Sequence, residues 1–360
     1  MNILHLQYAG KTGGIEKLNK DIGLASKNDT NIFMFVHEGG IICEEMKEVG
    51  LEVKEYSFKN KDILKLYRAI NNLVNEYKID IIIIHHPAPL IWLTSLIYAH
   101  KHNRAKIIVY AHNNYNEITK FNYIRRKIYN FLLKKCDHII AISKFVKKTF
   151  LENTQIGNEK ITVVYNGVNT NSYSMAKNRD GNLPIKLIYV GRLIQEKGVQ
   201  VLLQALSILE DKENYVLDIV GDGDYKGEIE RLIKKLGLTS NVNLLGNKRD
   251  IPIRLKNADC FIHPAIWEEG FGITIVEAMS SGLVCIAFRK GAIPEIIDTG
   301  INGFLVEEDT AEALAMKIKE LRYLLNSTKH AFIQQQAIIK SQKFTIENLV
   351  NELHKIYKKL

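Results

Sequence analysis

The chain has 360 residues, 46% hydrophobic and 25% charged, which is typical of a soluble globular protein and leaves room for two domains. Its four cysteines show no CxxC spacing, which argues against a disulfide framework or a structural zinc site and for a reducing compartment. We see no signal peptide and no apolar run long enough to span a bilayer, so we expect a cytoplasmic protein.

The net charge of +9 is concentrated in one segment. Residues 101–150 hold twelve Lys and Arg but only two acidic residues, Glu117 and Asp137, so the rest of the chain is about neutral. Such a segment should meet a polyanion, either an anionic membrane surface or nucleic acid.

The first half alternates short β-branched runs with helical patterns, which predicts βαβ units around a parallel sheet. We expect strands at residues 2–6, 32–36, 79–84, 106–110, 138–142 and 161–165, and an amphipathic helix at 61–77. Gly13 and Gly14 follow the first strand and precede a helix, where a glycine-rich turn suits contact with a phosphate or a sugar.

Two histidines, His85 and His112, end predicted strands of this half. Their side chains should therefore point to the edge of the sheet where ligands bind. A lone histidine is more often structural than catalytic, and from the residues alone both readings stay open.

Residues 120–135 mix aromatic, aliphatic and basic side chains at helical spacing. They predict a basic amphipathic helix that could lie at an anionic membrane surface. The alternative is a helix whose apolar stripe faces its own domain while its cations are solvated, and both can hold for different faces.

A polar stretch at residues 166–184 predicts a linker, after which the alternation restarts. We expect strands at 185–190, 217–220, 242–245, 260–263 and 284–286, with helices near 198–211, 224–236, 273–281 and 310–325, and a last basic helix at 345–360. The chain should therefore contain two doubly wound α/β domains with a ligand cleft between them.

The most informative segment runs from Glu268 to Gly282 and opens a helix after two glycines. Glycines let a phosphate approach the backbone, and the free N–H groups of a first helical turn bind anions. Glu277 lies one turn into that helix, where it can accept hydrogen bonds from a ribose diol, and Glu269 lies just before it. The spacing alone agrees equally well with a Glu277 side chain that merely faces solvent.

Two cations, Arg192 and Lys197, follow a predicted strand and can neutralise a diphosphate as its charge grows. Asp222-Gly223-Asp224 has the letters of a metal-binding DxD motif, but its glycine-rich context favours a tight strand-to-helix turn, so we expect no metal.

These segments resemble the retaining glycosyltransferases of family 4. Glu269 and Glu277 have that family's E-x₇-E spacing within an EGFG…EAM.SG context. Its GRL…EKG, VG.G and G.NG.LV segments are similar to residues 190–198, 220–223 and 300–306, so the resemblance covers about 185–310, and the first half more weakly.

The resemblance implies the GT-B fold, in which two doubly wound Rossmann-like domains face each other across a cleft. Residues 1–168 and a returning helix at 345–360 would form the acceptor-binding domain, 169–184 the linker, and 185–344 the nucleotide-sugar-binding domain. The implied catalytic residues are Arg192, Lys197, Glu269 and His112. The implied donor-binding residues are Gly13, Gly14, Gly221, Gly223, Arg249, Gly270, Phe271, Gly272, Ile273, Thr274 and Glu277.

The resemblance further implies a retaining, metal-independent transfer from a nucleotide-diphosphate sugar to a glycan or lipid-linked acceptor, without a cofactor. Together with the basic segment it predicts bacterial surface-polysaccharide or glycolipid synthesis by a peripheral enzyme at the inner face of the cell membrane. Two alternatives stay open: a sugar-nucleotide epimerase of the same fold, and a nucleic-acid-binding protein that uses residues 101–150. The second has no recognised motif to support it, and we expect no nucleic acid partner.

Overall fold

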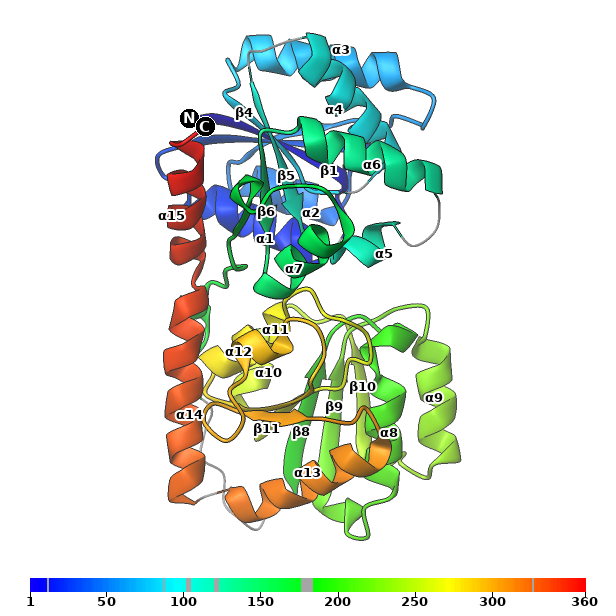
Figure 1. Cartoon of the computed structure of the whole chain (residues 1–360). Helices are drawn as coiled ribbons and strands as arrows, with labels where there is room; N and C mark the ends of the chain where they lie inside the picture. Colours follow the sequence, from blue (N-terminus) through cyan, green and yellow to red (C-terminus); the bar gives the residue numbers. More distant parts are fainter. Residues whose placement is uncertain (12, 87, 102–104, 120–122, 176–183, 326) are drawn as a thin grey trace. The chain divides into compact units, whose positions relative to one another are not determined.

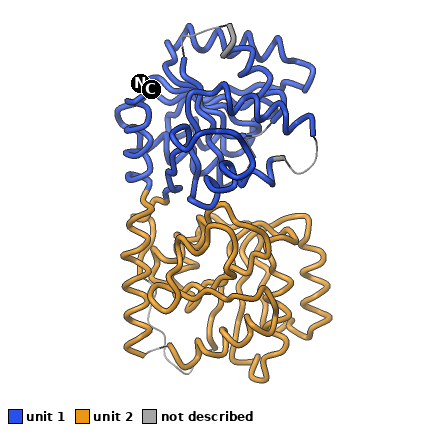
Figure 2. Tube along the Cα trace, in the orientation of Figure 1, with its two compact units in different colours: residues 1–167, 346–360 blue, residues 168–345 orange. Residues whose placement is uncertain are grey.

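A computed structural model describes the chain except residues 12, 87, 102–104, 120–122, 176–183 and 326. It divides into two units, which are coloured separately in Figure 2. Unit 1 comprises residues 1–167 and 346–360, and unit 2 comprises residues 168–345.

Unit 1 is built on a seven-stranded sheet in the order β3-β2-β1-β4-β5-β6-β7, and every strand pair is parallel. A central strand that is covered on both faces is typically an apolar run, as in β4, where Ile81–Ile84 are all buried. The strands are β1 (Asn2–Ala9), β2 (Thr30–Glu38), β3 (Glu52–Glu55), β4 (Ile81–Ile84), β5 (Lys106–Ala111), β6 (His138–Ala141) and β7 (Ile161–Val163).

The helices of unit 1 lie on both faces of this sheet (Figure 1). The last of them, α15, comes from the far end of the chain and packs on α1. They are α1 (Gly14–Ala25), α2 (Ile41–Glu48), α3 (Ile63–Glu76), α4 (Pro89–Lys101), α5 (Tyr115–Thr119), α6 (Tyr123–Lys135), α7 (Lys144–Asn153) and α15 (Ile346–Tyr357).

Unit 2 repeats the design with a six-stranded parallel sheet in the order β10-β9-β8-β11-β12-β13. Its strands are β8 (Ile185–Val190), β9 (Tyr215–Val220), β10 (Val242–Gly246), β11 (Cys260–His263), β12 (Val284–Phe288) and β13 (Phe304–Val306). Its helices are α8 (Val199–Ser207), α9 (Lys226–Lys235), α10 (Ile251–Lys256), α11 (Ile273–Ser280), α12 (Ile293–Ile296), α13 (Ala311–Leu324) and α14 (Thr328–Ser341).

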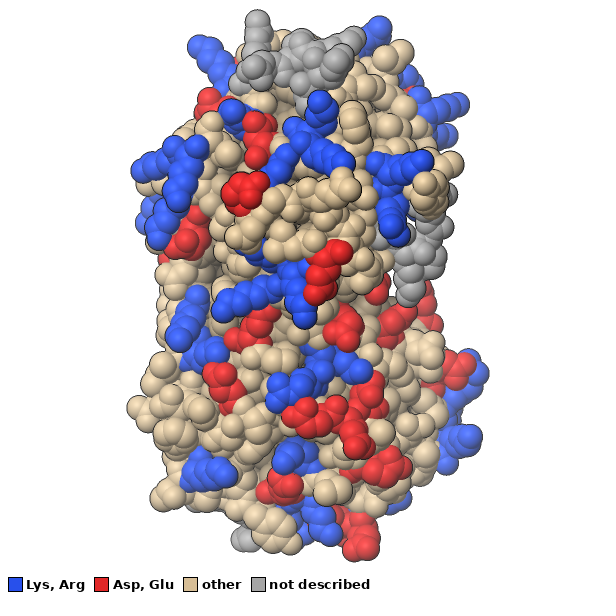
Figure 3. All heavy atoms as spheres, in the orientation of Figure 1, with Lys and Arg blue, Asp and Glu red and all other residues tan. Residues whose placement is uncertain are grey.

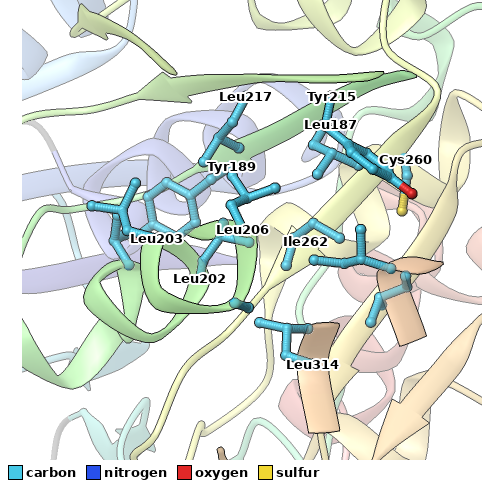
Figure 4. Close-up of a cluster of buried hydrophobic side chains, with 14 of the residues drawn as sticks. Leu187, Tyr189, Leu202, Leu203, Leu206, Tyr215, Leu217, Cys260, Ile262 and Leu314 are labelled. Carbon is cyan, nitrogen blue, oxygen red and sulfur yellow. The ribbon is translucent and has the colours of Figure 1, made fainter. Parts of the chain in front are cut away.

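The core of unit 2 lies between this sheet and the apolar faces of α8 and α13. Figure 4 shows Leu202 and Leu206 of α8 against Tyr189 and Ile262 of the sheet, with Leu314 of α13 beside them. All five side chains are fully buried, so they hold the helices to the strands through the hydrophobic effect.

Each sheet has one point at which the strand order reverses, between β1 and β4 in unit 1 and between β8 and β11 in unit 2. At such a point the loops that follow the two strands diverge to opposite faces and leave a crevice outside the carboxyl ends of the strands. The expected architecture of two doubly wound sheets is therefore confirmed, and each unit has its own place for a ligand.

The structure adds elements for which the sequence analysis made no prediction, notably β3, β13 and α14. Residues 176–183 of the expected linker lie outside the described residues, as do residues 120–122 of the expected basic helix. Within the described part of the chain, no helix is both long and apolar enough to cross a membrane.

Candidate active site

Two loops of unit 2 meet at the point where its strand order reverses. The first follows β8 and contains Arg192 and Lys197, and the second follows β11 and contains Glu269. A backbone hydrogen bond from Ile266 N to Glu196 O, 3.0 Å long, ties the two loops together. Lys197 and Glu269, which are 72 positions apart in the sequence, are thereby placed side by side.

The Lys197 ammonium forms an ion pair with Glu269 Oε1. The same carboxylate oxygen lies 3.2 Å from His263 Nε2, and Lys197 Nζ lies 5.0 Å from the centroid of the Trp267 ring. The carboxylate is buried and the ammonium nearly so. This group of one anion, one cation, one imidazole and one indole is the centre of the candidate site.

The ionisation of Glu269 is set by two opposing effects. Burial alone would raise the pKa of its carboxyl group, but the Lys197 charge and the hydrogen bond from His263 outweigh burial and hold that pKa well below its usual range. Glu269 is therefore a permanent anion at neutral pH and accepts hydrogen bonds without donating any.

Arg192 lies on the same loop, and its side chain is exposed. Its backbone carbonyl accepts a 2.9 Å hydrogen bond from the Tyr189 hydroxyl, which fixes the turn that follows β8. Among the described residues the Arg192 guanidinium forms no ion pair, whereas the Lys197 ammonium is already paired with the Glu269 carboxylate. Arg192 is thus the cation of this loop whose charge is available to an anionic ligand.

Helix α11 begins at the end of the second loop. Gly272 precedes it with φ of +108°, a conformation that favours glycine, and Ile275 N donates to Gly272 O. The preceding N–H groups, those of Ile273 and Thr274, have no acceptor within the helix, so they are suited to bind an anion. Glu277 is buried one turn further along.

The loop before α11 is held in place by its neighbours. Glu269 O accepts a 2.8 Å hydrogen bond from Ala292 N, and the Glu268 carboxylate accepts one of 2.5 Å from Gly291 N. Phe271 is buried with its ring edge-on to Phe344, and Gly270 connects it to Glu269. The predicted donor-binding residues of this segment therefore belong to a rigid loop.

The other glycines predicted at the site, Gly221 and Gly223, lie after β9. A Cβ on Gly221 would lie 1.8 Å from Gly191 O, so only glycine permits the close approach of the two loops. Asp222 in between is engaged locally: its Oδ1 accepts from Gly223 N at 2.8 Å and its Oδ2 lies 3.5 Å from Lys226 Nζ. Arg249 lies exposed on the loop after β10.

The predicted residues of unit 1 lie after the carboxyl ends of β1 and β5, on either side of β4 in the sheet. Gly13 precedes α1, Gly14 is its first residue, and Lys17 N donates to Gly13 O at 3.1 Å. His112 follows β5, is buried, and bonds through Nε2 to His85 Nδ1 at 2.9 Å. Burial, with a smaller contribution from His86, lowers the pKa of His112 to about 3, so its ring is neutral at pH 7.

His263 and Trp267 are the members of the site that the sequence analysis missed. His263 ends a predicted strand, which is the same signal that selected His85 and His112, and the signal could therefore have found it. Nothing in the sequence indicates that the Trp267 ring faces Lys197, because that contact depends on the path of the loop.

Two family models match the chain in succession, Glycosyltransferase Family 4 over residues 37–172 and Glycosyl transferases group 1 over residues 174–338. A glycosyltransferase from Rickettsia africae has a crystal structure with a TM-score of 0.85 and 27% identity, covering 99% of this chain and 98% of that one. The chain is a glycosyltransferase of the GT-B fold, and it belongs with those that resemble family 4.

Two further similarities concern proteins whose names carry more detail. Anabaena HepE, solved in complex with UDP and glucose, has a TM-score of 0.86 and 24% identity over 99% of both chains. The amylovoran biosynthesis glycosyltransferase AmsK of Erwinia amylovora is 31% identical over 166 residues, 44% of this chain and 40% of that one.

Proposed function

We propose that this protein transfers a sugar from a nucleotide-diphosphate donor to a hydroxyl of a glycan or lipid-linked acceptor, with retention of configuration. Unit 2 binds the donor and unit 1 binds the acceptor. The observation that carries the proposal is the grouping of Arg192, Lys197 and Glu269 beside the start of α11.

Each group has a task in this proposal. The free N–H groups at the start of α11 and the Arg192 guanidinium bind the diphosphate, and Glu277 accepts hydrogen bonds from the ribose. Negative charge on the diphosphate grows as the glycosidic bond breaks. The Arg192 guanidinium and the N–H groups of α11 therefore stabilise the transition state more than the ground state. Glu269, a fixed anion, accepts hydrogen bonds from the sugar hydroxyls and orients Lys197.

A UDP-sugar is the first donor to test, because HepE was solved with UDP and glucose. The protein would be incubated with UDP-, GDP- and ADP-sugars, with and without a membrane lipid extract, and nucleotide release would be measured. Release that requires extract supports transfer. Conversion of a UDP-sugar without any acceptor would instead indicate an epimerase.

Retention is proposed as a front-side displacement in which the leaving phosphate helps to deprotonate the acceptor hydroxyl. The chain would need no metal for this, because the Arg192 guanidinium and the N–H groups at the start of α11 supply positive charge to the diphosphate. Asp222 supports that view, since it already bonds to Gly223 and Lys226. We predict that activity survives EDTA; loss of activity on chelation with rescue by Mn²⁺ or Mg²⁺ would contradict the prediction.

The acceptor and the pathway are proposed from a different observation. AmsK is named for amylovoran biosynthesis, and we infer that this protein also works in the synthesis of a cell-surface polysaccharide or glycolipid. NMR of the purified product, with the anomeric coupling compared with that of the donor, tests retention and identifies the linkage.

We also propose that unit 1 docks reversibly on the anionic inner face of the cell membrane through α6. One face of that helix is buried, with Tyr129 stacked on Trp92 at 4.5 Å. The other face exposes Tyr123 at 69%, Ile124 at 65% and Phe131 at 53%, among exposed cations. Basic side chains gather over this part of unit 1 (Figure 3). Exposed aromatic and basic side chains on one face are typical of interfacial helices.

A further inference from the structure

Three histidine rings form a hydrogen-bonded row through the interior of unit 1. His5 lies in β1, His85 directly after β4 and His112 directly after β5, so the row crosses three neighbouring strands. His5 Nδ1 lies 2.9 Å from His85 Nε2, and His85 Nδ1 lies 2.9 Å from His112 Nε2. All three rings are buried.

Asn31 in β2 closes the row at its inner end. Asn31 Oδ1 lies 2.9 Å from His5 Nε2, and Asn31 Nδ2 donates to Asp29 O at 3.4 Å. The second contact fixes the amide, because a flipped Asn31 would place its oxygen against the carbonyl of Asp29. The group that faces His5 is therefore a pure acceptor, and His5 Nε2 must carry the proton.

The direction of this first hydrogen bond determines all the others. A neutral imidazole has one N–H and one acceptor nitrogen. With its proton on Nε2, His5 accepts at Nδ1 from His85 Nε2–H, and His85 then accepts at Nδ1 from His112 Nε2–H. The remaining nitrogen, His112 Nδ1, is left as an acceptor, and it bonds to no described residue.

Each of the three rings is neutral. Burial lowers the pKa of His5 to about 4 and that of His112 to about 3, and burial together with the neighbouring rings keeps the pKa of His85 well below its ordinary value. At neutral pH each ring carries a single proton, so the row has a single direction.

We propose that Asn31, acting through His5 and His85, fixes the tautomer of His112 so that its Nδ1 accepts a hydrogen bond from a hydroxyl of the acceptor bound by unit 1. Asn31, His5 and His85 are positioning residues, and only His112 touches substrate. The last step rests on the proposed function, whereas the tautomers do not. The row also makes the site selective for a group that donates, such as a hydroxyl.

The tautomers are measured directly with ¹⁵N-histidine-labelled full-length protein and two-bond ¹⁵N–¹H correlation spectra at pH 7.5. Signals are assigned by omission in His5→Phe, His85→Gln and His112→Asn, one variant for each ring. We expect the proton on Nε2 of His5, His85 and His112. A wild-type spectrum with Nδ1–H at any of the three rings overturns the proposal; the variants serve only to assign the signals.

Asn31→Leu removes the terminal acceptor while keeping a side chain of similar size. We expect His112 to lose its single tautomer, giving averaged or doubled ¹⁵N signals. The matched control is Asn19→Leu, because Asn19 is equally buried in unit 1 but bonds to no described residue. The control should keep the wild-type signals. An unchanged His112 in Asn31→Leu, or an equal change in Asn19→Leu, contradicts the role of Asn31.

Should Asn31→Leu fail to fold, His5→Phe takes its place, since it removes the first ring and retains a flat side chain beside Phe33. The contact with the acceptor is then tested with the acceptor on which wild type acts. We expect its Kd to rise about fivefold in Asn31→Leu, as for one neutral hydrogen bond. Altered tautomers with unchanged acceptor binding would overturn the contact with the acceptor while sparing the row. No turnover by wild type would refute the proposed function alone.

Discussion

Lys197 and Glu269 are buried together, and each supplies the charge that the other needs. Removing one member leaves an uncompensated buried charge, which costs more than removing both. Kinetic effects of a Lys197 variant therefore combine lost catalysis with lost stability. Arg192 is exposed and has no carboxylate partner in the described structure, so its variants report on the chemistry alone.

We predict that Lys197→Met destabilises unit 2 by about 3 kcal/mol, because Glu269 is left buried without its cation. The double variant Lys197→Met/Glu269→Gln should recover most of this loss and remain inactive. Urea unfolding would be followed by fluorescence in a Trp92→Phe background, where Trp267 reports on unit 2. Equal destabilisation in the single and double variants would show that the pair is not coupled.

Arg192→Ala should lower kcat about 10²–10³-fold with a smaller effect on donor affinity, because the charge it stabilises is largest in the transition state. Its urea midpoint should stay at the wild-type value. Arg231→Ala, which removes an exposed cation from α9, is the matched control and should change neither quantity. A change confined to KM would mean that Arg192 binds the ground state only.

Helix α6 shows how one element serves two environments. Leu132 and Leu133 are fully buried, whereas Phe131 between Asn130 and Leu132 is exposed. The interpretation of an apolar stripe that faces the unit's interior, with solvated cations on the other side, therefore describes α6, and docking on a membrane stays a prediction. Lys127 Nζ lies 4.6 Å from the centroid of the exposed Tyr123 ring, a pairing suited to a membrane surface.

Arg125→Gln/Arg126→Gln/Lys127→Gln should lose binding to anionic vesicles, since each cation contributes about 1 kcal/mol near such a surface. Sedimentation with phosphatidylserine-containing and purely zwitterionic liposomes measures the difference. The control Arg231→Gln/Lys234→Gln/Lys235→Gln removes the same charge from α9 and should bind like wild type. Equal binding of wild type to both kinds of vesicle would leave the cations of α6 merely solvated.

Elements with strong local patterns could be predicted, and those that depend on a neighbour could not. Buried strands such as β4 and β11 are continuous apolar runs. By contrast β3 (Glu52–Glu55) is short and polar and exists because β2 offers its edge. Helix α14 begins where Ser327 Oγ accepts from His330 N, in a stretch where we expected no element.

Several residues of the candidate site could likewise be predicted from local motifs, but their contacts with one another could not. Motifs with a fixed spacing, such as Glu269 and Glu277, could be selected from the sequence. The ion pair of Lys197 with Glu269 and the hydrogen bond of His263 could not, because they depend on how two loops approach each other. The direction of the histidine row required an amide contact that no sequence pattern encodes.

At the scale of the whole molecule, the buried neutral histidines make stability depend on pH. Their folded pKa values lie below the unfolded value of 6.5, so stability is full above pH 6.5 and is lost as the pH falls. Each ring contributes about 1.4 kcal/mol per pH unit while only the unfolded chain binds the proton.

We therefore predict that unit 1 loses stability steeply between pH 6.5 and about 4, where His5 itself becomes protonated. Urea unfolding at a series of pH values would be followed by Trp92 in a Trp267→Phe background. His85→Gln should give a shallower slope, by about one proton. A flat profile between pH 6.5 and 5 would mean that the rings are charged in the folded state.

Unit 1 is assembled from two stretches of chain with the whole of unit 2 between them. Asp29 joins the ends, because its carboxylate lies 2.9 Å from the Met1 ammonium and 3.0 Å from His354 of α15. On the ribosome, unit 2 is therefore synthesised in full before α15, the helix that packs on α1, has been made. Unit 2 can fold first, and residues 346–360 then complete unit 1, whose synthesis began before that of unit 2. No single cut in the chain can release unit 1 whole. Unit 1 can therefore be complete only after the ribosome has also translated unit 2.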